Sequence, residues 1–192
     1  MNREEALALV KPHLTDHRYT HTVGVTDTAI KLAKRYGANS KQAELAGIFH
    51  DYAKFRNKEE MRTLVKGKLT NNILILEYSS ELLHAPCGAY YVENEIGIKD
   101  EEILNAIRYH TTGRVGMTLL EKVIFLADYI EPGRDFKGVD EVRELATIDL
   151  DKAIIQMLVN TISFLMKRQQ QVFPTTIETY NDFIKKQKKK EK

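Results

Sequence analysis

Apolar residues recur at helical spacing along nearly the whole chain, and no run alternates in the way that a half-buried β-strand does. The four prolines fall at junctions between these patterns, where an all-helical fold tolerates them. The spacing therefore predicts an all-α fold, and a length of 192 residues favours a single-domain helical bundle. We expect helices at residues 3–11, 16–36, 41–53, 58–65, 72–77, 86–96, 101–110, 119–130, 139–146, 150–170 and 176–186.

Polar residues and glycines mark the expected ends of these helices. Four side chains precede a helical pattern and are expected to cap it: Ser40, Asn57, Asp100 and Asp149. Four glycines lie where a helix should stop: Gly37, Gly67, Gly97 and Gly113.

Charge is distributed unevenly. The chain has 29 Lys and Arg against 27 Asp and Glu, but residues 185–192 alone hold six lysines and one glutamate. We expect one domain over residues 1–184 and a basic, disordered tail over 185–192. The remaining body is weakly acidic, which argues against a nucleic-acid partner. A polyanionic substrate would need local positive charge, from a few placed side chains or from bound metal.

The chain is expected to be soluble and cytoplasmic, with no membrane partner. Residues 1–13 have no hydrophobic signal core, and the most apolar window, 153–166, is too short to span a bilayer. The single cysteine, Cys87, excludes an internal disulfide and a multi-cysteine zinc site.

Three segments are apolar on all sides and lead directly into polar residues. Residues 45–49 run into His50 and Asp51, residues 123–127 into Asp128, and the weaker segment 103–107 leads to His110. A carboxylate in such surroundings must be paired, protonated or bound to metal. For Asp128 alone, an exposed stripe or a nearby arginine is an ordinary explanation.

The polar residues on different predicted helices form a set. The candidate metal ligands are His21, His50, Asp51, His84, His110 and Asp128. A bundle can aim such side chains into one central cavity. Four histidines and two aspartates are too many for one tetrahedral ion and suit a two-metal centre. Histidine-rich ligation favours iron, manganese, cobalt, nickel or zinc over magnesium or calcium.

For two of these histidines the sequence also allows an interpretation other than a metal ligand at that position. His17 and His21 are four residues apart, and spacing does not say which one is the ligand. His84 also fits an ordinary turn histidine.

The series resembles the H…HD…H…H…D pattern of the HD-domain metal-dependent phosphohydrolases. The flanking residues are similar to those of the bacterial symmetrical diadenosine-tetraphosphate hydrolases of the YqeK type, and the resemblance extends to about Tyr180. The matching blocks are Arg18-Tyr19-Thr20-His21, His50-Asp51-Tyr52-Ala53-Lys54, His84-Ala85-Pro86, His110-Thr111-Thr112-Gly113 and 128–134.

The resemblance implies an HD fold over residues 1–184 with two metal ions, expected to be iron. One ion would be held by His21, His50, Asp51 and Asp128, and the other by His84 and His110, with Asp51 bridging. It favours His21 over His17. It also implies that a metal-bound hydroxide splits diadenosine tetraphosphate in the middle to give two ADP.

Cationic side chains near the ligands are expected to contact phosphate oxygens. Lys54 follows His50 by four residues and Arg18 precedes His21 by three, so each would share a helix face with a ligand. We assign Arg18 and Lys54 to substrate binding and, with Asp51, to catalysis. Without the resemblance, a snorkelling surface charge is the simpler interpretation of both cations.

Four further residues are assigned to the substrate side of the site. Arg134 is expected to contact phosphate, and Thr111 and Thr112 to orient water or phosphate by their hydroxyl groups. Glu131 is expected to support a ligand or handle a proton.

Gly24 and Gly47 each lie inside a predicted helix, where glycine costs about 1 kcal/mol relative to alanine. Each is three residues from a ligand histidine. We expect the two helices to approach closely at these glycines.

Two other functions stay open. One is an HD-domain hydrolase of another nucleotide, such as a nucleoside di- or triphosphate or a cyclic dinucleotide. The other is a non-catalytic nucleotide- or RNA-binding factor that uses the lysine tail. A homodimer is compatible with either.

Overall fold

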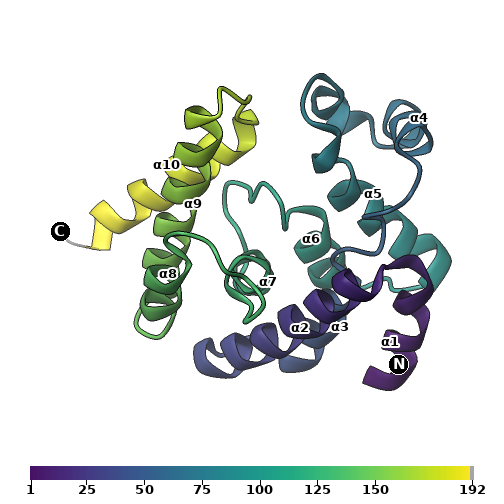
Figure 1. Ribbon diagram of the computed structural model, residues 1–192, viewed down its shortest axis with the longest axis horizontal. Helices are drawn as coiled ribbons and strands as arrows, with labels where there is room; N and C mark the ends of the chain where they lie inside the picture. Colours follow the sequence, from purple (N-terminus) through teal and green to yellow (C-terminus); the bar gives the residue numbers. More distant parts are fainter. Residues whose placement is uncertain (191–192) are drawn as a thin grey trace.

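The computed structural model describes residues 1–190, and every regular element within them is helical (Figure 1). In chain order these elements are α1 (Arg3–Val10), the 3₁₀ turn η1 (Lys11–His13), α2 (Asp16–Tyr36), α3 (Ser40–Phe49), α4 (Lys58–Lys68), the 3₁₀ segments η2 (Thr70–Glu77) and η3 (Ser80–Leu82), α5 (His84–Tyr91), the π-helical turn η4 (Val92–Ile96), α6 (Glu101–Arg108), α7 (Leu119–Ile130), α8 (Val139–Ala146), α9 (Leu150–Lys167) and α10 (Pro174–Lys190).

Helix α7 is the centre of the bundle. It packs against α2, α3 and α6 on one side and against α8 and α9 on the other (Figure 1). Its side chains Val123, Ile124, Leu126 and Ala127 are fully buried, as its uniformly apolar sequence predicted. The main core is therefore continuous across α7, and a functional residue on this helix is held by packing on both sides.

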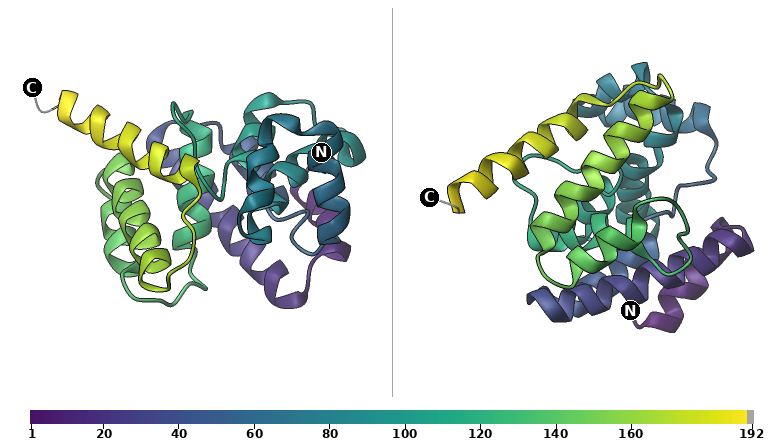
Figure 2. Two further views of the ribbon diagram at one scale, coloured as in Figure 1. Left: turned by 90° about the horizontal axis from the view of Figure 1, so that it is seen from above. Right: turned by 60° about the vertical axis from the view of Figure 1, so that its left-hand side comes forward.

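The remaining helices extend the body in two directions. A smaller apolar cluster that includes Met61, Val65, Ile75 and Cys87 joins α4, η2 and α5. At the other end, α10 packs on α9, and its C-terminal end projects from the body (Figure 2).

Several sequence signals mark the helix ends correctly. Asn57, Asp100 and Asp149 each cap a helix by accepting backbone N–H bonds, and Gly37 and Gly97 end helices in the left-handed conformation.

Three of these signals were wrong. Gly113 has a positive φ of 63°, but it lies in the loop after α6, which has already ended at Arg108. Asn39 rather than Ser40 caps α3, because its side chain accepts the N–H groups of Lys41 and Gln42. Gly67 does not stop α4, which continues to Lys68.

The helix ends nearest the candidate ligands differ from the prediction. Helix α3 ends at Phe49, not at residue 53, so His50 and Asp51 lie in a turn. Helix α6 ends at Arg108, two residues before His110, and α5 begins at His84 rather than at residue 86. Three of the four candidate histidines therefore lie at helix ends.

Helix α10 extends to Lys190, four residues beyond its expected end. The expected tail thus overlaps the helix over residues 185–190, and its last two residues lie outside the part of the chain that the structure describes. Among residues 1–190, no helix is long and apolar enough to cross a membrane.

Candidate metal centre

The carboxylate of Asp51 lies between two pairs of histidines. Its Oδ2 atom is 3.3 Å from His50 Nε2 and 3.9 Å from His21 Nε2. Its Oδ1 atom is 3.1 Å from His84 Nε2 and 3.8 Å from His110 Nε2. One buried carboxylate therefore presents one oxygen to each pair, which is the arrangement that a bridging ligand of two cations requires.

Asp128 completes the cluster from helix α7. Its Oδ1 atom is 3.0 Å from His21 Nε2 and 3.9 Å from His50 Nε2. The four histidines and Asp51 are buried, whereas the Asp128 side chain is 23% exposed. The structure thus brings together all six residues that the sequence singled out, and solvent reaches the cluster on the Asp128 side.

Three of the histidine rings are oriented by the backbone. In each, Nδ1 donates to the carbonyl oxygen three residues earlier, at 2.6–2.7 Å: His50 to Gly47, His84 to Glu81 and His110 to Ile107. The Gly47 and Ile107 carbonyls belong to the last turns of α3 and α6, where helices leave carbonyl groups without intrahelical partners. Because a carbonyl only accepts, Nδ1 carries the proton, and the Nε2 lone pair of the neutral ring faces the cluster.

These lone pairs fit a metal ion. The Nε2 atoms of His21 and His50 are buried without a hydrogen bond, and the polar atoms beside them, Asp128 Oδ1 at 3.0 Å and Asp51 Oδ2 at 3.3 Å, are themselves acceptors. The Nε2 atoms of His84 and His110 are 3.0 Å apart, and with both protons on Nδ1 neither nitrogen can donate to the other. Buried acceptors without donors are unfavourable, and divalent cations would satisfy them.

The electrostatics keep the carboxylate charged. Burial would raise the pKa of Asp51, but His50 and His84 outweigh burial and hold this pKa well below its ordinary value. Burial, together with His84 and His50, lowers the pKa of His110 to about 3. Asp51 is therefore ionised and His110 is neutral at ordinary pH, the protonation states that metal binding needs. Burial acts to lower the pKa of His50, but Asp51 outweighs it and raises this pKa, so a cation bound there would take the place of a proton.

Glu131, at the end of α7, lies behind His21. Its Oε1 atom accepts from His21 Nδ1 at 3.0 Å, and its Oε2 atom accepts from the Gly133 N–H at 2.6 Å. Glu131 is buried and orients His21. This contact agrees with the first of its two expected roles, which was to support a ligand.

The two helix glycines have different neighbours. A Cβ atom on Gly47 would lie 3.0 Å from the Thr26 Cα atom of α2, so the expected close approach of α2 and α3 is confirmed there. A Cβ atom on Gly24 would instead lie 2.6 Å from Glu131 Oε2. The expectation that Gly24 faces the other helix was therefore wrong, and this glycine makes room for the carboxylate behind His21.

The three cations assigned to phosphate are each paired with a carboxylate. Arg18 Nη1 is 3.0 Å from Asp51 Oδ2, and Arg134 Nη2 is 2.9 Å from Asp128 Oδ1. Arg18 is therefore part of the cluster rather than a snorkelling surface charge.

Lys54 Nζ is 3.3 Å from Glu81 Oε2. Lys54 does not share a helix face with His50 as expected, because α3 ends at Phe49.

A model of the HD domain matches residues 18–133, which is more than half of the chain and contains all six clustered residues. The chain belongs to the HD-domain family.

Relatives of this HD-domain protein cover nearly its whole length. Three carry the name "Bis(5'-nucleosyl)-tetraphosphatase, symmetrical". The one from Halalkalibacterium halodurans is 64% identical over 98% of this chain and 100% of its own. The one from Bacillus subtilis is 63% identical over 94% of this chain and 97% of its own.

A solved structure has the same fold. It is a predicted HD superfamily hydrolase involved in NAD metabolism, from Clostridium acetobutylicum, with a TM-score of 0.89 and 39% identity over 97% of this chain and 98% of that chain. The family resemblance seen in the sequence is thus confirmed.

Two cavities of this HD domain flank the cluster. One, of about 280 Å³, is lined by His110, Thr111, Asp128 and Arg134 together with apolar side chains of α7 and α9. The other, of about 340 Å³, is lined by Arg18, His21, Glu131 and Arg134 among others. Arg134 borders both cavities, so a substrate that extends across the cluster would pass this guanidinium group.

The two threonines that follow His110 differ in position. Thr111 lines the first cavity. The Thr112 side chain is buried, and its hydroxyl donates to the Gly113 carbonyl at 3.0 Å. Thr112 therefore stabilises the turn in this structure, and Thr111 is the better placed of the two for a bound phosphate.

Sequence reasoning missed two groups of residues near the cluster. Glu81 fixes His84 through its carbonyl and pairs with Lys54 through its carboxylate. Tyr129 and Phe136 line the first cavity. No local signal marks either group, because backbone carbonyls and ordinary apolar residues have no motif.

Proposed function

We propose that this chain is a metal-dependent hydrolase that cleaves diadenosine tetraphosphate symmetrically into two ADP. The observation that carries the proposal is the position of Asp51, with one oxygen toward His21 and His50 and the other toward His84 and His110. The names of the relatives at 63–64% identity support the substrate.

The six side chains would divide between two divalent ions. His21, His50, Asp51 and Asp128 would hold one, and His84 and His110 the other, with Asp51 shared. Such ions lower the pKa of water and neutralise charge on phosphate oxygens. Iron as the natural metal, a cytoplasmic location and a homodimer belong to the same proposal.

The protein's own groups would bind and orient the tetraphosphate. Arg18 and Arg134 each contact a ligand carboxylate and line a cavity beside the cluster, so phosphate oxygens entering there meet a guanidinium group on either side. Lys54, held by Glu81, would add charge on the His84 side, and Thr111 a hydroxyl on the His110 side.

Glu131 would act through His21. By accepting the Nδ1 proton it keeps the Nε2 lone pair directed at the cluster and makes the ring a better donor to a cation. Although Glu131 lines the second cavity, its two oxygens are taken up by the bonds from His21 and Gly133, so its role would be to hold the histidine rather than to contact phosphate. Thr112 would contribute only by holding the turn after His110.

Chromatography of the products tests the proposal. Metal-loaded wild type should convert diadenosine tetraphosphate into ADP alone, and Asp51→Ala should be inactive while still folded. Formation of AMP and ATP, or preferential cleavage of a mononucleotide or cyclic dinucleotide, would instead support the alternative hydrolase activities.

A further inference from the structure

An aromatic recess lies beyond the first cavity, between α7, the loop to α8 and α9. We use "aromatic recess" for the hollow of about 430 Å³ that is lined by Tyr129, Phe136, Lys137, Asn160, Thr161 and Phe164. The rings of Tyr129 and Phe136 have centroids 4.9 Å apart at an interplanar angle of 78°. The two rings thus form walls of different orientation. The other lining residues include the amide of Asn160, the hydroxyl of Thr161 and the ammonium group of Lys137.

The recess adjoins the cavity beside the metal centre. Tyr129, Phe136 and Thr161 line both the aromatic recess and the first cavity, which also contains His110 and Asp128. Tyr129 directly follows Asp128 on α7. A molecule whose phosphates lie at the cluster would therefore need to extend only past these shared side chains to reach the recess.

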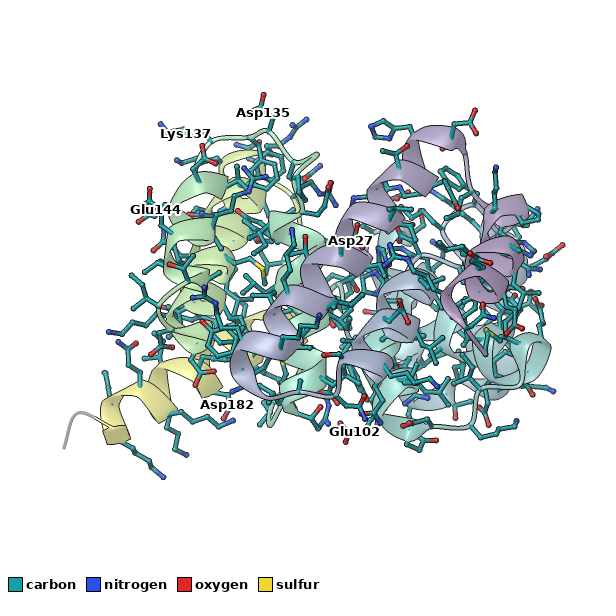
Figure 3. All side chains as sticks on the ribbon, turned by 90° about the horizontal axis from the view of Figure 1, so that it is seen from below. Asp27, Glu102, Asp135, Lys137, Glu144 and Asp182 are labelled. Carbon is teal, nitrogen blue, oxygen red and sulfur yellow. The ribbon has the colours of Figure 1, made fainter. Side chains whose placement is uncertain are left out.

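Of the three rings of the recess, Tyr129 packs against the main core, whereas Phe136 and Phe164 do not belong to it. Phe136 is 40% exposed and Phe164 is 55% exposed. Large apolar side chains gathered around a hollow at the surface are typical of a binding site. Lys137 lies at the outer edge of the α8–α10 group (Figure 3).

Most of the recess lies outside the HD-domain match. That match ends at residue 133, so five of its six lining residues come from the chain after it. The metal ligands all lie within the residues that match the HD domain, whereas most of the aromatic recess is built by the residues that follow. Residues outside the HD-domain match that form a cavity beside the metal centre are suited to determine which substrate binds there.

We propose that the aromatic recess binds the nucleobase of one half of the substrate and thereby selects nucleotides over simple polyphosphates. The proposal rests on the proposed function and names the part of the substrate that lies away from the phosphates. The base would pack against Phe136 and Phe164, and Thr161 would offer a hydrogen bond to its edge. Asn160, which bonds Gln156 and the Gly138 carbonyl, holds the wall of the recess in place. A planar base with polar edges matches this lining better than an aliphatic group does.

Calorimetric titration of the metal-loaded protein with ADP and with inorganic pyrophosphate tests the recess. ADP should bind wild type more tightly than pyrophosphate. In Phe164→Ala the affinity for ADP should fall by roughly 5- to 150-fold, the range for a lost base–aromatic stack, with pyrophosphate unchanged. Phe136→Ala should have the same effect.

Met166→Ala is the matched control. Met166 lies on α9 with Phe164, is 66% exposed and does not line the aromatic recess. This variant should bind ADP and pyrophosphate as wild type does. Similar losses in Met166→Ala and Phe164→Ala would overturn the proposal.

Two further outcomes would also overturn it. One is ADP binding in wild type no tighter than pyrophosphate binding. The other is unchanged ADP affinity in Phe164→Ala; if a dimer also dissociates in sedimentation, the rings cover a second copy of the chain instead. Base-dependent ADP binding without tetraphosphate hydrolysis would contradict the proposed function and leave the recess supported.

Discussion

Glu131→Gln is a sensitive perturbation of the centre because it preserves the size of the side chain. Both oxygens of Glu131 accept hydrogen bonds, from His21 Nδ1 and from the Gly133 N–H. Glutamine has one acceptor oxygen, so its amino group must face one of these two donors. A buried donor left without an acceptor costs about 1–3 kcal/mol.

The same change should weaken the metal centre. Loss of a carboxylate behind a ligand histidine lowers metal affinity by roughly 10- to 100-fold, which corresponds to about 1.4–2.7 kcal/mol. Competition with a chelator measures the affinity, and urea unfolding of the metal-free protein measures the stability. Hydrolysis at limiting metal should fall with the affinity.

Glu121→Gln is the matched control. Glu121 is also a buried carboxylate on α7, and its two oxygens accept from Arg114 Nη2 at 2.7 Å and from the Thr118 N–H at 3.3 Å. The Glu121→Gln variant should be less stable than wild type but should bind metal with the same affinity. The reasoning is refuted if Glu131→Gln binds metal as wild type does, or if both variants lose the same affinity.

Three other predictions concern packing and protonation. Gly47→Ala should destabilise the protein by about 1–3 kcal/mol in urea, because its Cβ would lie 3.0 Å from the Thr26 backbone; unchanged stability would contradict the close approach. In metal-free protein, His110 has a pKa of about 3 in the fold and about 6.5 in the unfolded chain, so stability should fall as pH drops between these values, and a flat urea midpoint would contradict this. Burial raises the pKa of the Cys87 thiol to about 12, so thiol reagents at pH 8 should label it only after unfolding.

The candidate ligands were predictable because each one interrupts an apolar pattern or belongs to a spaced series. Asp128 follows a run that is buried on all sides, and a carboxylate there requires a partner. What the pattern missed is the turn at His50. Residues 45–53 contain no proline, and the only glycine among them, Gly47, lies before the end of α3, so nothing local marks the stop.

Supporting interactions were less predictable because they depend on tertiary structure. The Ile107 carbonyl becomes an anchor for His110 only because α6 ends near it. Phe136 and Phe164 read as ordinary apolar residues, and only the packing of α9 beside α7 brings them together at one hollow. For Gly24 the sequence marked the position, but the partner that needs the space comes from residue 131.

The central claim is that the cluster around Asp51 holds two metal ions that the hydrolysis requires. Metal analysis of anaerobically purified protein tests it most directly, with hydrolysis of diadenosine tetraphosphate measured on the same samples. The account predicts two metal equivalents per chain in wild type, and loss of both metal and activity in Asp51→Ala. Metal-free wild type that hydrolyses the substrate, or an Asp51→Ala variant that keeps its activity, would contradict it.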